Sequence, residues 1–284
     1  MSSPAVQTEA IFLLDRNVVS LIKDAVAGKT QTDAKKQAYL EWLRTLDVPV
    51  HSISPLLSTM EGEKGYEDSI REKAASLEKE TYAVGQFFKC ASTDAAHLLG
   101  FRDSVAGLFT GMKESLWDER ADFLIKAAPL VAQKVAVSKR RGLENELVQL
   151  ARATGLAAND AIVILFLACL YGSDAARRVI KPAKPSVHNV LTDLHAIPRV
   201  GMVKAIAKQL PSPLRVRLLT RDEGLFDVLK HMRIVRPRFA TANRLEMQIE
   251  YRPALFPALA AADAFALLQR LEDAATSNTS SGAI

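Results

Sequence analysis

The sequence predicts an α/β fold in which a mainly parallel sheet is sandwiched by helices. Short apolar strands alternate with longer segments of helical periodicity, and few of the turn signals that join hairpin strands are present. The two clearest strands, at 11–14 and 215–219, lie far apart in the chain. Strands that are separated by helices pair mostly in parallel, so we expect a parallel sheet that helices cover.

The N-terminal part predicts strand, helix, helix and strand in that order. The apolar run at 11–14 ends in Asp15 and is followed by a helical segment at 18–26. Apolar residues at nearly helical spacing predict a helix over 31–46, and a second short buried segment follows at 50–53.

The long middle part, 54–152, predicts a set of helices. It shows no alternation with a period of two, and it is rich in Ala, Leu, Lys and Glu. The candidate breaks between these helices are Gly65, Gly85, Gly100, Gly107, Gly111 and Gly142.

The C-terminal part returns to alternating helices and strands. An apolar helix is expected to start near Asp160, and a loop with two prolines follows at 181–185. A helix from about Thr192 to Leu210 precedes the strand at 215–219. The remaining expected elements are a helix at 222–232, a short strand at 234–235, a helix at 257–275 and a disordered tail at 276–284.

Composition constrains the function only weakly. The 284-residue chain is 49% hydrophobic with a net charge of +5, which fits a polyanionic partner and is also common in proteins that bind no nucleic acid. Cys90 and Cys169 lack a CxxC partner or nearby paired histidines, so neither a zinc site nor a disulfide is expected. The apolar run at 161–171 is too short to cross a bilayer and no secretory signal is present, so we expect a cytoplasmic protein without membrane contact.

Carboxylates follow both of the clearest strands. Asp15 comes directly after the first strand, and Thr220-Arg-Asp222 follows the last. Because ligands of parallel α/β folds gather at the carboxyl ends of strands, these residues are the first site candidates. The alternative is that Asp15 and Asp222 each only cap the helix that follows, which is a common role for Asp.

Three segments, taken in order, resemble the PIN-domain nucleases. Ile-Phe-Leu-Leu-Asp15-Arg-Asn17 resembles the family's opening strand, which ends in Asp-x-Asn before the first helix. Glu61, which stands four residues before a glycine, is similar to the acid that the family carries on a later helix. Thr220-Arg-Asp222 resembles the family's Thr-x-Asp strand end.

A fourth acidic position has two candidates. Asp160, in Asn-Asp-Ala-Ile-Val, resembles the commoner family pattern but lies far from Thr220 in the sequence. Asp193 is expected to start the helix that immediately precedes the strand, which fits the family's topology better, so it carries slightly more weight. For both aspartates, capping a helix and binding a metal are compatible roles.

The resemblance implies a metal-dependent endonuclease whose ligands for Mg²⁺ or Mn²⁺ are Asp15, Glu61, Asp222 and either Asp160 or Asp193. Of these, all but Asp160 are expected to be catalytic. Hard divalent cations prefer carboxylate and water oxygens, and they activate a water for attack on a phosphodiester. RNA is the expected partner, with DNA as the alternative, and an antitoxin or another inhibitory protein is a further expected partner of a toxin or defence nuclease.

Two other functions stay open: a catalytically silent PIN-like module that binds nucleic acid or protein, and a deoxyribonuclease of the flap type. The oligomeric state also stays open. The expected organisation is a PIN-like domain at 1–240 with a helical insertion at about 66–155, a helical extension at 241–275 and the tail at 276–284. No glycine-rich phosphate loop, Ser/His/Asp spacing or Cys/His nucleophile pair is present, which narrows the range of possible enzyme classes.

Overall fold

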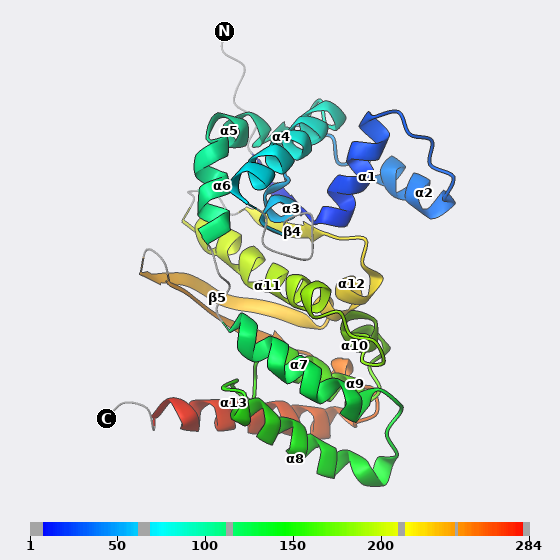
Figure 1. Ribbon diagram of the computed structural model, residues 1–284, viewed down its shortest axis with the longest axis vertical. Helices are drawn as coiled ribbons and strands as arrows, with labels where there is room; N and C mark the ends of the chain where they lie inside the picture. Colours follow the sequence, from blue (N-terminus) through cyan, green and yellow to red (C-terminus); the bar gives the residue numbers. More distant parts are fainter. Residues whose placement is uncertain (1–7, 62–68, 112–115, 210–213, 242–243, 281–284) are drawn as a thin grey trace. The chain divides into compact units, whose positions relative to one another are not determined.

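A computed structural model of the chain describes residues 8–61, 69–111, 116–209, 214–241 and 244–280 (Figure 1). The elements of the first part are β1 (Ala10–Leu14), α1 (Arg16–Val26), α2 (Ala34–Arg44), β2 (His51–Ser54), α3 (Leu56–Glu61), α4 (Ile70–Phe87), β3 (Ser92–Thr93), α5 (Ala95–Gly100) and α6 (Arg102–Gly111).

The second part begins with α7 (Trp117–Val131), α8 (Val137–Ala153), α9 (Ala161–Leu170), α10 (Asp174–Ile180) and α11 (Val187–Ala207). It continues with β4 (Arg215–Leu219), α12 (Glu223–Leu229), β5 (Met232–Thr241), β6 (Arg244–Tyr251), a short 3-10 helix (Pro253–Leu255) and α13 (Ala261–Ser280).

The chain packs into two compact units. Unit 1 comprises Met1–Lys113, Pro198–Arg221 and Arg236–Glu246, and unit 2 comprises Glu114–Ile197, Asp222–Val235 and Met247–Ile284. The helix α11 and the strands β5 and β6 therefore have residues in both units. The domain boundaries that the sequence suggests stay a prediction.

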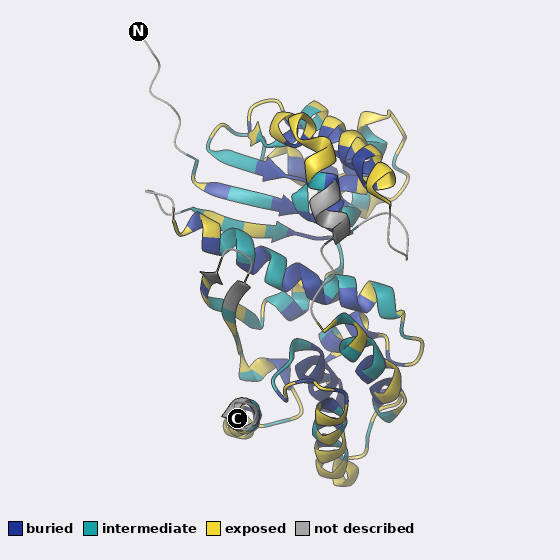
Figure 2. Cartoon of the chain, turned by 60° about the vertical axis from the view of Figure 1, so that its left-hand side comes forward, coloured by how far each residue is buried: buried dark blue, intermediate teal, exposed yellow. Residues whose placement is uncertain are grey.

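Unit 1 is built on a parallel sheet with the strand order β3-β2-β1-β4. In Figure 2 the strands of this sheet are mostly dark blue and teal, whereas the helices around it carry exposed yellow residues. The register pairs Leu13 of β1 with Ser54 on one side and with Leu218 on the other. The predicted α/β class, a parallel sheet flanked by helices, is thus confirmed.

The core of unit 1 fixes the position of α1 against the sheet. Leu14 is fully buried at the end of β1, and Val18 and Ile22 are fully buried in the first and second turns of α1. Ile53 of β2 and Val84 of α4 join the same apolar cluster. Burying these side chains stabilises the strand, turn and helix that surround Asp15.

Unit 2 is organised around one apolar helix, α9. Its residues 162–170 are all buried, as is expected for a helix that is hydrophobic on every side. Phe166 meets Phe123 of α7 edge to face, with the ring centroids 5.3 Å apart. Across the described residues of the chain, no helix is long and apolar enough to cross a bilayer.

Several expected helix breaks are wrong. Gly85 lies inside α4, Gly107 inside α6 and Gly142 inside α8, whereas Gly100 does end α5. A single glycine inside a helix costs only about 1 kcal/mol relative to alanine, so the packing of the long helices outweighs it. The expected break at Gly65 lies outside the described residues.

Other element boundaries also differ from the sequence prediction. The helix α11 begins at Val187, ahead of the expected start at Thr192, and β5 and β6 form a separate two-stranded sheet that extends well beyond 234–235. The two-residue strand β3 was not expected at all. The helix α13 runs to Ser280, into the segment that was expected to be disordered, because an established helix adds residues at little cost.

Asp47 links the loop after α2 to the loop before β3 in unit 1 through hydrogen bonds. It follows α2, and its carboxylate accepts hydrogen bonds from the backbone N–H groups of Lys89, Cys90 and Ala91, which precede β3, at 2.7 to 3.0 Å. Partial burial alone raises the pKa of Asp47, but these backbone hydrogen bonds outweigh it and hold the pKa below the ordinary value of 3.8.

Replacing Asp47 by Ala is expected to lower the free energy of unfolding by about 1 to 2 kcal/mol at pH 7, because three backbone donors lose their acceptor. Since the folded-state pKa is lowered, this contribution is complete above the unfolded-state pKa and disappears as the pH falls through the folded-state value. Urea denaturation between pH 7 and pH 3.5 measures it. Asp24→Ala, which removes an exposed ion pair with Lys29, is the control and should cost less than about 0.5 kcal/mol; an equal effect in both variants contradicts the role of Asp47.

Candidate functional site at the carboxyl end of β1

Asp15 lies buried between β1 and α1, with 6% of its surface exposed. It occupies the N-cap position of α1, yet its side chain makes no capping hydrogen bond to that helix. Its backbone N–H donates to the carbonyl oxygen of Leu219 at 2.9 Å, which continues the β1–β4 ladder by one residue. The carboxylate is therefore directed away from the simple capping role.

Two polar side chains hold the carboxylate of Asp15 instead. The hydroxyl of Thr220 donates to Oδ2 at 2.5 Å, and Nδ2 of Asn17 donates to the same oxygen at 2.6 Å. The amide oxygen of Asn17 in turn accepts the backbone N–H of Arg221 at 2.8 Å. Residues about 205 positions apart in the sequence thus orient one carboxylate.

Glu61, the last residue of α3, brings a second carboxyl group to Asp15. A hydrogen bond between the side chains of Glu61 and Asp15 lowers the pKa of Asp15, so the two carboxyl groups adjoin. Burial raises the pKa of Asp15 above its ordinary value of 3.8, although the hydrogen bonds from Thr220, Glu61, the Arg16 amide and Asn17 act in the opposite direction.

The structure adds Asp94, which sequence reasoning missed. Asp94 directly follows β3, and its Oδ2 accepts a hydrogen bond from the hydroxyl of Ser54, the last residue of β2, at 2.5 Å. Its other oxygen is buried without a hydrogen-bond partner among the described residues, and burial raises the pKa of Asp94. The carboxyl ends of β3, β2, β1 and β4 thus carry Asp94, Ser54, Asp15 and Thr220 in that order.

A further buried carboxyl group of unit 1, Glu80, was also not expected. It lies on α4 with 2% of its surface exposed, and the hydroxyl groups of Thr59 and Ser76 each lie 3.3 Å from it. Burial raises the pKa of Glu80. Its sequence neighbourhood is that of any helical glutamate, so no local signal identifies it.

The other three predicted ligands belong to unit 2. Asp222 caps α12, with its Oδ1 accepting the Leu225 N–H at 2.8 Å. Asp193 is the seventh residue of α11, so the expectation that it starts this helix is wrong. The helix begins earlier because residues 187–192 also contribute apolar side chains to the core, including the buried Val190 and Leu191.

Asp160 is already engaged by other groups of unit 2. It caps α9 through the Ile162 N–H at 3.0 Å and forms an ion pair with Arg120 at 2.9 Å, with its side chain 6% exposed. Arg120 also donates to Nε2 of the fully buried His195 at 2.9 Å. A carboxylate that is neutralised by a guanidinium is a poorer metal ligand than one without such a partner.

The donor set of unit 1 fits a hard divalent cation in part. Mg²⁺ usually binds one or two protein carboxylates and keeps several waters, and Asp15 and Glu61 supply two adjoining carboxyl groups. A bound cation would offset the mutual repulsion of these two carboxyl groups when both are ionised. Within the described ranges, no three His, Cys, Asp or Glu side chains are grouped so that they could hold an ion.

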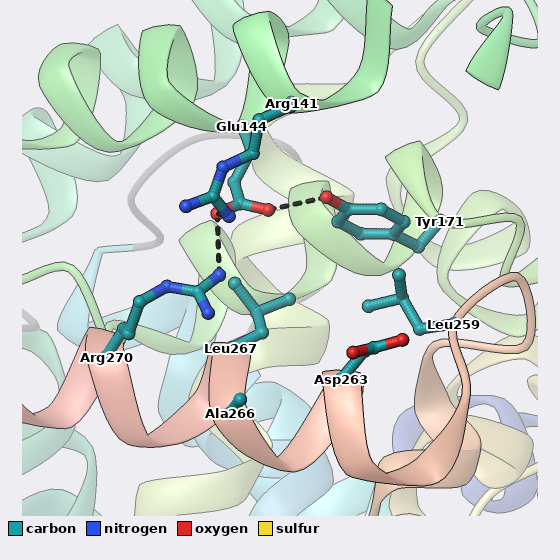
Figure 3. A pocket seen from close by; sticks show the side chains of 8 residues that line it. All are labelled: Arg141, Glu144, Tyr171, Leu259, Asp263, Ala266, Leu267 and Arg270. Atoms are coloured by element: carbon teal, nitrogen blue, oxygen red, sulfur yellow. Dashed lines mark hydrogen bonds and ion pairs between the residues drawn. The ribbon is translucent and has the colours of Figure 1, made fainter. Parts of the chain in front are cut away.

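A different buried carboxylate, Glu144, lies in a small pocket of unit 2 (Figure 3). It accepts hydrogen bonds from the hydroxyl of Tyr171 at 2.5 Å, from Arg141 at 2.5 Å and from Arg270 at 3.0 Å. Burial and the adjoining carboxylate raise the pKa of Tyr171 to about 12. Because all its polar contacts are satisfied, Glu144 joins α8, the end of α9 and α13 as a structural link.

The chain matches no protein-family model, no curated protein and no solved structure in the comparisons made with each. Its function is therefore argued from the arrangement of its own side chains.

Replacing Asp15 by Asn is expected to raise the melting temperature by several degrees at pH 7 in EDTA, because the variant keeps the hydrogen bonds and loses a buried charge. A raised folded-state pKa means that the unfolded chain ionises first as the pH rises, so the wild-type loses stability from about pH 3.8 up to the folded-state pKa. The difference between variant and wild-type should therefore shrink towards pH 4. A variant that melts below the wild-type at pH 7 shows instead that the charge is stabilising.

Replacing Glu144 by Gln is expected to lower the free energy of unfolding by about 2 kcal/mol, since two guanidinium groups lose their buried counter-charge while remaining partly exposed to water. Chemical denaturation measures the loss. Glu146→Gln on the same helix removes an exposed carboxylate and should change stability by less than about 0.5 kcal/mol. Equal stability of the two variants would show that the Glu144 link is dispensable.

Proposed function

We propose that this chain is a metal-dependent endonuclease that hydrolyses phosphodiester bonds of RNA with Mg²⁺ or Mn²⁺. The observation that carries the proposal is the Asp15–Glu61 pair at the carboxyl end of a parallel sheet, where two carboxyl groups adjoin. Such a pair is unfavourable without a proton or a cation between its members. Its location matches the usual place of ligand sites in parallel α/β folds.

The orientation of Asp15 supports the same reading. An aspartate that only caps a helix accepts hydrogen bonds from the backbone N–H groups of that helix, whereas Asp15 accepts them from the side chains of Thr220 and Asn17. Side chains that orient a metal ligand are typical of metal sites. The resemblance of the Asp-x-Asn and Thr-x-Asp segments to PIN-domain nucleases agrees with this arrangement.

In the proposed reaction, Asp15 and Glu61 would hold the ion, and Thr220 and Asn17 keep the Asp15 carboxylate in place. A bound ion lowers the pKa of a coordinated water and neutralises charge on the phosphate. The half-buried Glu61, as a carboxylate beside Asp15, would accept the proton that the attacking water loses. Burial of Asp15 and Thr220 keeps bulk water away from this side of the site.

The three aspartates of unit 2 stay predicted ligands. The Arg120 ion pair disfavours Asp160, so Asp193 and Asp222 carry more weight than Asp160 as predicted ligands. A catalytically silent binding module is the second candidate. It is favoured by the engagement of Asp160 with Arg120 and by the capping role of Asp222, which leave Asp15 and Glu61 as the adjoining pair.

The purified chain is expected to cleave single-stranded RNA in Mn²⁺ or Mg²⁺ and to lose this activity in EDTA. Asp15→Asn should reduce the cleavage rate at least about 100-fold, because the variant cannot hold the ion. Independently of activity, Mn²⁺ should raise the melting temperature of the wild-type and leave that of Asp15→Asn unchanged. Asp24→Asn, an exposed residue of α1, is the matched control and should behave like the wild-type.

The same cleavage assay tests which of Asp160, Asp193 and Asp222 binds the metal ion. Asp222→Asn keeps its helix cap, because Asn caps about as well as Asp, so a loss of cleavage without a loss of stability identifies a ligand. Asp193→Asn is expected to inactivate the chain and Asp160→Asn to leave it active. A wild-type chain that binds RNA but does not cut it in the presence of any divalent metal favours the silent module. Full cleavage activity of Asp15→Asn rejects the proposed site.

A further inference from the structure

Two aromatic side chains of α2 lie side by side in unit 1. Tyr39 and Trp42 are neighbours on one face of the helix, with their ring centroids 5.2 Å apart and their planes tilted by 51°. Tyr39 packs half-buried against the core of unit 1, while Trp42 is 43% exposed. The pair therefore presents an indole ring to solvent on a support that is fixed by the core.

The guanidinium group of Arg221 lies over the ring of Tyr39. The Cζ atom of Arg221 is 5.9 Å from the centroid of Tyr39, within the range of a cation–π contact. Its guanidinium makes no hydrogen bond or ion pair with the residues that the structure describes. The N–H donors of Arg221 are thus available, and a guanidinium is well suited to bind a phosphate through two parallel hydrogen bonds.

Hydrogen bonds connect Arg221 to the Asp15 site. Its backbone N–H donates to Asn17, which in turn donates to Asp15. Burial raises the pKa of Tyr39 to about 12, with the charge of Arg221 lowering it and the charge of Asp15 raising it. The Arg221 contact over the Tyr39 ring thus adjoins the hydrogen bonds that orient Asp15.

We propose that Tyr39, Trp42 and Arg221 form a platform that binds one unpaired nucleotide beside Asp15. The base stacks on the exposed indole ring, and the guanidinium of Arg221 binds the adjacent phosphate. This inference rests on the proposed nuclease function and names the form of its substrate. A base inside a duplex is already stacked and paired, so only a single strand can offer its ring to Trp42.

The alternative is that these contacts only stabilise the fold: Tyr39 fills the edge of the core, and Arg221 neutralises the surroundings of Asp15. In that case truncating Trp42, whose ring is widely exposed, changes neither RNA binding nor the choice between single and double strands. Stacking on an aromatic side chain, in contrast, contributes a measurable share of single-strand affinity and is tolerant of sequence.

Fluorescence anisotropy of the full chain with a labelled 12-nucleotide RNA in EDTA tests the platform without cleavage. Trp42→Ala is expected to weaken single-strand binding about tenfold, and Trp42→Phe to restore most of it. Arg221→Gln should weaken binding and reduce its dependence on salt. Tyr82→Ala, which removes an aromatic side chain of α4 that is 60% exposed, is the matched control and should bind like the wild-type.

A spectroscopic readout separates stacking from mere proximity. The chain has two tryptophans, so Trp117→Phe leaves Trp42 as the fluorophore, and single-stranded RNA should quench it more strongly than a duplex of the same sequence. Unquenched Trp42, unchanged affinity of Trp42→Ala, or equal affinity for single strand and duplex each overturns the platform, even if Asp15-dependent cleavage is observed. Quenching with Trp42-dependent binding but no cleavage supports the platform and rejects the nuclease.

Discussion

The parallel pairing of β1 with β4 is the contact on which the Asp15 site depends. It pairs Leu14 with Leu219 and continues through the Asp15 N–H, so that Thr220 lies beside Asp15. Side chains alternate along a strand, and a shift of one residue in this register would turn Thr220 to the opposite face. The packing of the apolar side chains of β1 and β4 therefore sets the position of the hydrogen bond between Thr220 and Asp15.

Burying the carboxyl group of Asp15 lowers the stability of the folded chain. A buried carboxylate costs free energy unless hydrogen bonds or a cation offset it, and Asp15 has the hydrogen bonds of Thr220, Asn17 and Glu61. Buried titratable groups that are only partly compensated are typical of functional sites. The same logic separates Asp15 from Glu144, whose charge is balanced by two arginines and a tyrosine.

Carboxylates that look alike in the sequence take different roles in the structure. Asp222 and Asp160 both follow the pattern of a helix cap and do cap their helices, whereas Asp15 holds the N-cap position without capping. Asp160 additionally meets Arg120. The distinction depends on which donors approach from elsewhere in the fold, and a sequence pattern does not report those.

The local pattern of the sequence was enough to determine the β1 and β4 strands, the buried helix α9, the parallel α/β class and the position of Asp15 at a strand end. These follow from hydrophobic periodicity, which is a property of a few neighbouring residues. Glu61 was found through a resemblance to a family motif, and its contact with Asp15 is a property of the folded chain. Only the tertiary structure decided the rest: the pairing of the two-residue strand β3 that places Asp94, the position of Arg221 over Tyr39, and the burial of Glu80. Each of these joins residues far apart in the chain, and such contacts are set by the packing of the whole core rather than by any local preference.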